Sequence, residues 1–273
     1  MMRGMFAAIS GLKNHQVMLD VTSNDIANVN TIGYKSARTT FKDSLTQVQR
    51  GASAPGGGTG GSNPAQVGLG TQLGSIDNMM QAGALQSTGN PLDVAIQGPG
   101  FFRVAPGTPP AVPTEGIEYT RAGNFATNSQ GHLMTQEGYF VLGRDAAGAD
   151  SLITIPPGST NIAIGQTGDV SYVDAAGVRQ PAGFISLATF SNSSGLERSG
   201  SNRWAESANS GAPAVGVPSA QFGFTTAGAI EMSNVDLAQS FTTMITAQRG
   251  FQANSRIIST ADEMLQDLVN LKR

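Results

Sequence analysis

Residues 237–268, LAQSFTTMITAQRGFQANSRIISTADEMLQDL, carry apolar side chains at a regular interval of seven positions. The seven-spaced set is Leu237, Met244, Phe251, Ile258 and Leu265, and beside it lie Phe241, Ala247, Ala261 and Leu268. A strict seven-residue repeat keeps one apolar seam turned toward a partner helix and produces a gentle left-handed supercoil. The stretch therefore predicts a long helix that pairs with another helix.

The ends of this predicted helix follow from its capping residues. Ser233 can act as an N-cap, so we expect the helix to start at Ser233–Asn234, with Asp236 in its first turn. Lys272 and Arg273 would lie in the last turn, where the helix dipole favours cations. At 1.5 Å per residue the helix would be ~50 Å long, more than a compact domain of this size needs.

The N-terminal residues repeat the same pattern. The seven-spaced set is Met5, Leu12, Leu19 and Ile26, and Met2 and Ile9 add a second position to the stripe. A single amphipathic helix more often covers the core of its own domain. Two such helices at opposite ends of one chain favour a different interpretation, in which they form a coiled pair that extends away from the body.

The middle of the chain has the character of a β-domain. Short runs such as DVAIQG, YFVLG and FISLATF are bounded by Gly, Asn, Asp or Pro, and no helical period continues across them. The segment before them, Gly51 to Gly70, is rich in Gly, Pro and Ser and predicts a flexible linker. We therefore predict an α+β protein in which the terminal helices form a coiled-coil-like domain beside an antiparallel all-β domain. The expected divisions are an N-terminal helical segment 1–45, an extension 46–72, a β-domain 73–230 and a C-terminal helix 231–273.

The composition excludes several classes of function. Charged residues make up 13% of the 273 residues and the net charge is −3, which argues against nucleic acid and against a polybasic membrane patch. The chain has no cysteine, so disulfides, thiolate catalysis and cysteine-based zinc sites are excluded. The short apolar run at the N-terminus breaks at Lys13–Asn14–His15–Gln16 without a cleavage pattern, so we expect no Sec-type signal peptide. No segment reaches the length of a transmembrane helix.

The sequence contains no recognisable catalytic pattern. His15 and His132 are its only histidines and lie more than a hundred residues apart. The carboxylates are scattered over predicted turns and strand ends, and no nucleophile elbow, P-loop or metalloprotease motif is present. We therefore expect no catalytic residues, no metal site and no cofactor.

Three asparagines follow one another closely in SNDIANVNTIGYK, residues 23–35: Asn24, Asn28 and Asn30. Asn side chains bond to nearby backbone and tolerate left-handed conformations, so the cluster can simply end a helix, with Gly33 as the stop position. In the other interpretation, Asn24 and Asn28 share a helix face and bond across helix boundaries to fix the register of an assembly. The residues alone leave the two interpretations equal.

Four stretches of the chain resemble the flagellar rod and hook proteins, the axial family of the bacterial flagellum. The N-terminal match is MFAAISGLKNHQVMLDVTSNDIANVNTIGYKSARTTFKD, the β-domain matches are PLDVAIQGPGFFRV and YTRAGNFATNSQGHLMTQEGYFVLG, and the C-terminal match is SNVDLAQSFTTMITAQRGFQANSRIISTADEMLQDLVNLKR. They cover well over half the chain in the family's order. Asp25 departs from the asparagine more frequent in the family, and we expect no consequence for the assignment to the family.

Within this family, the sequence is interpreted as a hook protein. Both the C-terminal run and the extension APGGGTGGSNPAQVGLGTQLGSIDN resemble hooks, the extension being similar to that of Gram-positive and some other bacteria. The chain is short for a hook, so we predict a compact form with one main β-domain. A distal rod protein, which forms a straight, rigid drive shaft, is the alternative.

The resemblance implies a structural subunit that passes unfolded through the type III flagellar export apparatus, without signal-peptide cleavage, and polymerises outside the cell. The implied tube links rod to filament and transmits torque as a universal joint. Its implied partners are further copies of the chain, the distal rod protein, the hook cap and the hook–filament junction proteins, with neither nucleic acid nor membrane insertion. The helices would pack between subunits through Met5, Ile9, Leu12, Leu19, Ile26, Leu237, Phe241, Met244, Phe251, Ile258, Leu265 and Leu268.

Polar contacts between subunits would come from Asn24, Asn28, Asn30 and Asn254. Each large apolar residue buried in the assembly would contribute roughly 1.5–3 kcal/mol, so the terminal segments are expected to become ordered on assembly. A head-to-tail contact that does not close into a ring generates a helical tube. A secreted β-adhesin with coiled-coil ends is a second class of hypothesis, and it predicts trimers of fixed size instead of growing tubes.

Overall fold

A computed structural model describes residues 2–271, apart from 55–59, 108, 110–111, 114 and 146–147. Lys272, Arg273 and the side chain of Leu268 lie outside the described part. The chain divides into two compact units. The helical unit comprises Met1–Ala27, Ala37–Asn78 and Asp236–Arg273, and the β-body comprises Asn28–Ser36 and Met79–Val235. The predicted α+β class is confirmed.

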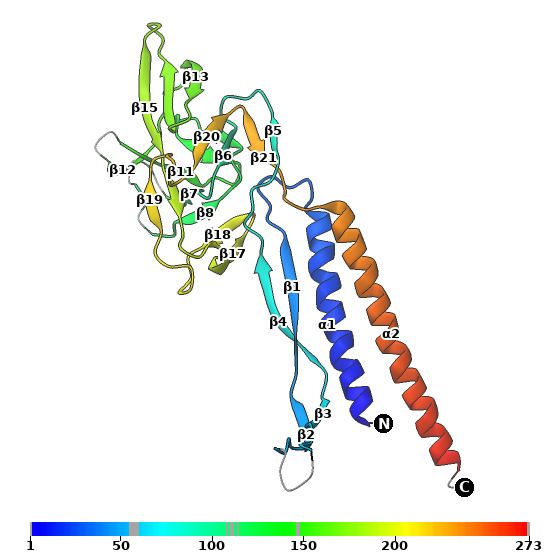
Figure 1. The fold of residues 1–273 in the computed structure, drawn as a ribbon. Helices are drawn as coiled ribbons and strands as arrows, with labels where there is room; N and C mark the ends of the chain where they lie inside the picture. Colours follow the sequence, from blue (N-terminus) through cyan, green and yellow to red (C-terminus); the bar gives the residue numbers. More distant parts are fainter. Residues whose placement is uncertain are drawn as a thin grey trace. The chain divides into compact units, whose positions relative to one another are not determined.

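Two antiparallel helices dominate the helical unit. Helix α1 spans Met2–Ala27 and helix α2 spans Leu237–Asn270, and they run side by side in opposite directions (Figure 1). Helix α2 begins after Asp236, whose carboxylate accepts hydrogen bonds from the backbone N–H of Ala238 at 2.9 Å and of Gln239 at 3.1 Å. The predicted start at Ser233–Asn234 is therefore wrong. The Ser233 hydroxyl accepts a bond from Val235 N instead, which forms a turn before the helix.

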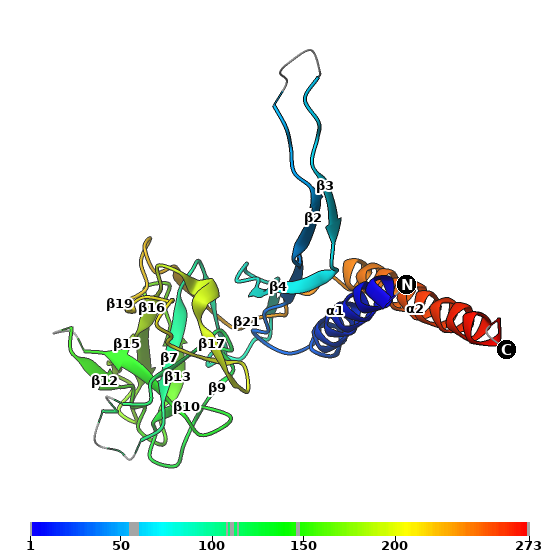
Figure 2. The same ribbon diagram turned by 90° about the horizontal axis from the view of Figure 1, so that it is seen from below.

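A long β-hairpin completes the helical unit. Strands β1 (Ala37–Asp43) and β4 (Thr71–Asn78) pair antiparallel, and the hairpin continues into β2 (Thr46–Arg50) and β3 (Ala65–Gly68). The outer β2–β3 pair stands clear of both helices (Figure 2). Part of the predicted extension 46–72 is thus paired strand: TQVQR precedes the predicted linker, AQVG lies within it, and both have enough β-branched and alternating character to form a ladder. The boundary expected at residue 73 falls inside β4.

The end of α1 also differs from the prediction. The helix stops at Ala27, so Asn28 and Gly33 lie beyond it. Gly33 does have a left-handed backbone, with φ +67°, but its role is close packing. A Cβ atom at this position would lie 2.6 Å from the backbone N of Ala122. Gly33 therefore lets residues 28–36 lie directly against another segment of the β-body.

The β-body is built on one large antiparallel sheet, in which thirteen strands join among the described residues. Its central path runs β13–β14–β15–β11–β7–β8–β18–β17, and the remaining strands branch from it. The strands are β7 (Phe101–Ala105), β8 (Glu118–Thr120), β9 (Phe125–Thr127), β10 (Leu133–Thr135), β11 (Phe140–Arg144), β12 (Asp150–Leu152), β13 (Thr160–Ile164), β14 (Asp169–Val173), β15 (Arg179–Ile185), β16 (Leu187–Thr189), β17 (Glu197–Gly200), β18 (Arg203–Ala205) and β19 (Ala214–Gly216).

Two smaller pairs complete the body: β6 (Val94–Gln97) with β20 (Phe224–Ala227), and β5 (Leu85–Ser87) with β21 (Ala229–Glu231). A short 3₁₀ turn spans Ser193–Gly195. The main core is formed by residues such as Phe102, Val141 and Leu187, each fully buried, and a second cluster surrounds Trp204. The antiparallel β-domain expected from the turn-punctuated sequence is confirmed.

A bidentate ion pair fastens β7 to β12 within the sheet. The buried Arg103 guanidinium donates to both carboxylate oxygens of Asp150, each at 2.9 Å, and to the Ser186 hydroxyl at 3.1 Å. The Arg103 hydrogen bonds hold the pKa of Asp150 below its ordinary value of 3.8. A carboxylate with a depressed pKa stabilises the fold above that ordinary value, and the stabilisation is lost as the pH falls through the folded-state pKa.

Replacing Asp150 by asparagine is therefore expected to reduce stability at pH 7 and to have less effect in acid. Urea unfolding followed through Trp204, the single tryptophan, tests this at pH 7 and at pH 3. The difference between the wild-type protein and Asp150→Asn should shrink at the lower pH, because pH 3 lies below the ordinary pKa of 3.8 and the carboxylate of the unfolded chain is then mostly protonated. An equal difference at both values would contradict the assignment.

Candidate functional site

The two helices approach closely through small residues. Ala8, Ala247 and Ala261 are buried. A Cβ atom at Gly11 would lie 2.8 Å from the Asn254 side chain, and one at Gly250 would lie 2.5 Å from the ring of His15. These two contacts are reciprocal: each helix places a glycine opposite a polar side chain of the other. The contacts fix an antiparallel register for the pair.

The predicted seam residues are only partly covered by this pairing. Half-buried positions are Met5, Ile9, Leu12, Leu19, Ile26, Met244, Phe251, Ile258 and Leu265. Leu237 and Phe241 are exposed, at 42% and 50%. The pairing of α1 with α2 within one chain thus shelters part of the stripe and leaves the rest accessible.

A second row of apolar residues, not predicted, lies beside the seam. Phe6 is 60% exposed, Ile245 51%, Ile257 48% and Met264 50%. Each is the direct neighbour of a half-buried seam residue, in the pairs Met5–Phe6, Met244–Ile245, Ile257–Ile258 and Met264–Leu265. These doubled apolar positions are the sequence signal that could have revealed the outer row. With them, the apolar stripe is wide enough to cover both the contact face between the two helices and an outer, exposed face.

The four predicted asparagines lie in different settings. Asn24 is exposed on α1, and Asn30 is exposed beyond the helix. Asn28 lies in a turn, where its carbonyl accepts from Thr31 N at 3.1 Å and its side-chain oxygen accepts from the Thr31 hydroxyl at 3.0 Å. The expectation that Asn24 and Asn28 share a helix face is wrong, because α1 ends between them. Asn254, half-buried, lies over Gly11.

Two polar residues of α1 make contacts that the sequence did not suggest. The buried Asn14 donates its side-chain amide to the Thr71 hydroxyl at 2.9 Å, which joins α1 to β4. Asp25, 5% exposed, accepts from Ala37 N with both carboxylate oxygens at 3.2 Å. The Asp25 carboxylate thus holds the first residue of β1 against the last turn of α1.

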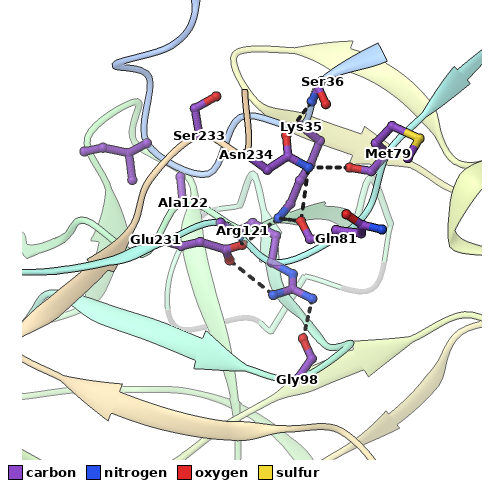
Figure 3. Close-up of polar contacts among 12 residues, drawn as sticks. Lys35, Ser36, Met79, Gln81, Gly98, Arg121, Ala122, Glu231, Ser233 and Asn234 are labelled. Atoms are coloured by element: carbon purple, nitrogen blue, oxygen red, sulfur yellow. Dashed lines mark hydrogen bonds and ion pairs between the residues drawn. The ribbon is translucent and has the colours of Figure 1, made fainter. Parts of the chain in front are cut away.

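Three buried charged side chains contact one another in the β-body, and two of them come from the segments next to the terminal helices in the sequence (Figure 3). Glu231 is fully buried, and one of its oxygens lies 2.5 Å from the Lys35 ammonium, which is also fully buried. Its other oxygen lies 3.1 Å from the guanidinium of Arg121, of which 2% is exposed. We call Lys35, Arg121 and Glu231 the buried triad.

Backbone groups satisfy most of the remaining hydrogen-bonding capacity of the triad. Gly83 N donates to Glu231 at 2.8 Å, and the Lys35 ammonium donates to the carbonyl of Gln81 at 2.8 Å. Arg121 donates to the carbonyl of Gly98 at 2.6 Å and lies 5.0 Å from the centre of the Phe101 ring. Burial lowers the pKa of both Lys35 and Arg121, while the Glu231 carboxylate acts in the opposite direction on both.

Beside the triad, the uncharged side chain of Asn234 joins neighbouring segments by hydrogen bonds (Figure 3). Its side-chain oxygen accepts from Ser36 N at 2.8 Å, and its amide donates to the carbonyls of Met79 at 2.8 Å and Gln81 at 3.2 Å. One amide therefore ties together residues from three distant parts of the sequence. We use the term junction for the buried triad together with Asn234.

Three stretches of this chain, which form most of the two helices and part of the β-body, match known protein families. Residues 5–35 match the family described as "Flagella basal body rod protein", residues 95–172 match "Flagellar hook protein FlgE/F/G D1 domain", and residues 226–271 match "Flagellar basal body rod FlgEFG protein C-terminal". The flagellar basal-body rod protein FlgG of Bacillus subtilis (strain 168) is 49% identical over 275 residues, with 100% of both chains covered. This chain belongs to the flagellar rod and hook protein family.

Other members of the rod and hook family align over the whole chain as well. The flagellar basal-body rod protein FlgG of Caulobacter vibrioides is 39% identical over 275 residues, covering 99% of this chain and 100% of that protein. The flagellar hook protein FlgE of Borreliella burgdorferi is 28% identical over 450 residues, with all of both chains covered. The predicted family is confirmed, and the chain is a structural axial protein, not an enzyme.

The remaining polar groups of this rod/hook protein fit a structural role. His132 bonds through Nδ1 to the Thr154 hydroxyl at 3.0 Å, within the β-body. Over the described ranges, no three His, Asp or Glu side chains are grouped as a metal site. No helix in the described part of the chain has the length and apolar character needed to cross a membrane.

The junction of this rod/hook protein was missed by sequence reasoning. Its members are far apart along the chain, at positions 35, 121, 231 and 234, and each is an ordinary residue in a turn-rich context. A weak signal was present at Lys35 and Glu231, because each is the charged residue next to the point where a predicted helix was expected to meet the body. Spacing alone could not show that the two are buried against each other.

Proposed function

We propose that this rod/hook protein is a subunit of the distal rod, which forms a straight, rigid drive shaft, and not of the hook. The observation that carries the proposal is the end-to-end match with a rod protein at 49% identity over 275 residues. The alignment with a hook protein extends over 450 residues, against 273 in this chain, so much of that hook has no counterpart here. This length difference favours the rod over the compact hook first predicted.

The helical unit would supply the contacts between copies. The outer apolar row and the exposed Leu237 and Phe241 lack cover in one chain, and each large side chain buried on assembly would contribute about 1.5–3 kcal/mol. The predicted seam residues would complete their burial in the same contacts. Asn24, Asn28, Asn30 and Asn254 remain proposed polar contacts between subunits. Repetition of one head-to-tail contact would generate the tube.

The outer hairpin would make the tube rigid. All five residues of β2 are exposed, and the hairpin carries uncovered apolar side chains, including Leu45 at 74% and Val48 at 55%. A two-stranded hairpin is at best marginally stable by itself in water, so a neighbouring copy is its natural support. A hairpin fixed in this way would lock adjacent subunits, as a shaft requires.

Replacing both Leu45 and Val48 by serine tests this role. The ladder between β2 and β3 uses backbone bonds, so we expect the helices still to polymerise, but into tubes that are curved or irregular. Electron microscopy of polymers grown from the purified protein measures their curvature. Gln66→Ser, a polar change on the exposed strand β3, is the control and should leave the tubes straight. Straight tubes from the double variant would contradict the locking role.

The same experiment separates the rod from the other interpretations. Wild-type protein at rising concentration should give straight tubes of growing length. Curved tubes would favour the hook, and discrete particles of fixed size would favour the adhesin. Under the rod proposal the principal partners are further copies of the chain within the basal body, and export through the flagellar apparatus precedes assembly. The hook cap and hook–filament junction partners belong to the hook interpretation.

A further inference from the structure

Two segments of the β-body connect directly to the terminal helices. Residues 28–36 follow α1, and residues 229–235 precede the N-cap of α2. They bond to each other as well as to the body: Gly33 N donates to the carbonyl of Glu231 at 2.8 Å, and Ser36 N donates to Asn234 at 2.8 Å. The two segments therefore share part of their hydrogen bonding inside the body.

The buried triad adds ion pairs to the hydrogen bonds that join the two segments to each other and to the body. Glu231 belongs to one segment and Lys35 to the other, while Arg121 belongs to the sheet-bearing part of the body. One carboxylate thus forms ion pairs with two cations, one from the other segment and one from the sheet-bearing part, and all three side chains are at least 98% buried. If residues 229–235 left alone, Lys35 and Arg121 would stay buried without a counter-charge, which is strongly unfavourable. If residues 28–36 left alone, the Glu231 carbonyl and the Asn234 side chain would lose the amide donors of Gly33 and Ser36.

A second arginine holds the first segment from its other side. Arg198 donates to the carbonyl of Lys35 at 2.6 Å and stacks 5.2 Å from the ring of Tyr34 and 5.2 Å from that of Trp204. The main apolar core, around Phe102 and Val141, includes no residue of either segment. Loss of the segments would therefore expose the junction without removing a side chain from that core.

We propose that the buried triad acts as a single electrostatic latch, so that residues 28–36 and 229–235 detach from the β-body only together. The opened state is local: the large sheet stays folded while residues 28–36 and 229–235 separate from the rest of the β-body. Local opening of a contiguous structural unit, below the energy of global unfolding, is a general property of folded proteins. Here the unit consists of two segments almost two hundred residues apart in sequence, joined by one carboxylate.

Hydrogen exchange of the full chain, monomeric in dilute solution, tests the latch through Glu231→Gln. Glutamine keeps the shape of the side chain but leaves Lys35 and Arg121 without a counter-charge. We expect the amides of Gly33, Ser36 and Met232, all bonded at or beside the junction, to exchange faster by one common factor of about a hundred. The amides of Leu133 and Ile185 in the sheet should exchange more slowly than these three in both proteins, because their exchange requires the sheet itself to open.

Two results would overturn the latch. If Met232 exchanges faster while Gly33 and Ser36 do not, the segments open independently. If Gly33, Ser36 and Met232 exchange no faster than Leu133 and Ile185 in either protein, the opening is global and no local latch exists. Asp150→Asn is the matched control, since it removes a carboxylate from another arginine pair of the same body and should leave the three junction amides unaffected.

A second variant keeps the test decisive if Glu231→Gln does not fold. Lys35→Met removes one cation and leaves Arg121 paired with Glu231, so the triad becomes neutral overall. The same three amides should then accelerate together, by about tenfold, because the Glu231 carboxylate and the Gln81 carbonyl each lose one hydrogen-bond donor. Acceleration confined to Gly33 and Ser36 would count against the latch.

Discussion

Replacing Glu231 by glutamine is expected to lower the free energy of unfolding of the β-body by about 3–5 kcal/mol. The wild-type carboxylate is fully buried and lies within 3.1 Å of two cations, so its loss leaves two buried charges uncompensated. A change of this size is a large fraction of the stability of a typical domain. Urea unfolding followed by the fluorescence of Trp204, 3% exposed within the body, measures it.

Glu137→Gln is the matched control for this prediction. It makes the same chemical change in the same body, at a side chain that is 44% exposed and pairs with Arg203. Arg203 keeps a second carboxylate, Glu118, at 2.6 Å, and exposed ion pairs contribute at most about 1 kcal/mol. If both variants lose the same small amount, the buried triad contributes no more than a surface pair.

The second large effect is expected on assembly, from replacing Phe6 and Ile245 together by serine. Both side chains are at least half exposed in one chain, so the fold should not depend on them. Under the rod proposal both become buried between copies, at roughly 1.5–3 kcal/mol each. The concentration needed for polymerisation should rise by about a hundredfold or more. Sedimentation and electron microscopy at increasing protein concentration measure it.

The double variant needs two companion measurements. Val178→Ser, which removes a 53% exposed apolar side chain from the β-body, should leave polymerisation unchanged. Far-ultraviolet circular dichroism and Trp204 fluorescence should be the same in all three proteins, which shows that the monomers fold alike. Tubes formed by Phe6→Ser/Ile245→Ser at the wild-type concentration would refute the role of the outer apolar row.

The helices were predictable because their signal is repeated many times within a short range. Seven-residue spacing recurs from Leu237 to Leu265 and again from Met5 to Ile26, so one irregular position does little harm to the pattern. The β-body was predictable for a related reason, since many short runs are each bounded by turn residues. Both inferences needed only neighbours in sequence.

The features that were missed depend on single residues or on distant partners. The N-cap of α2 is decided by which of three nearby polar side chains has the right backbone geometry, and Asp236 has it because Ser233 and Asn234 are used in other bonds. The hairpin was hidden by the glycines around its strands. The junction brings positions 35, 121 and 231 together, and no local pattern encodes such a meeting.

The reciprocal glycine contacts of α1 and α2 determine how far one helix can slide along the other. An apolar repeat alone tolerates a slip of seven residues, because equivalent side chains meet again. In this pair such a slip would set His15 against Ile257 and Asn254 against Met18, in place of the glycines that accommodate them. The axial offset of the helices is therefore a fixed length of the molecule, and any polymer built from the pair would inherit a single repeat distance from it.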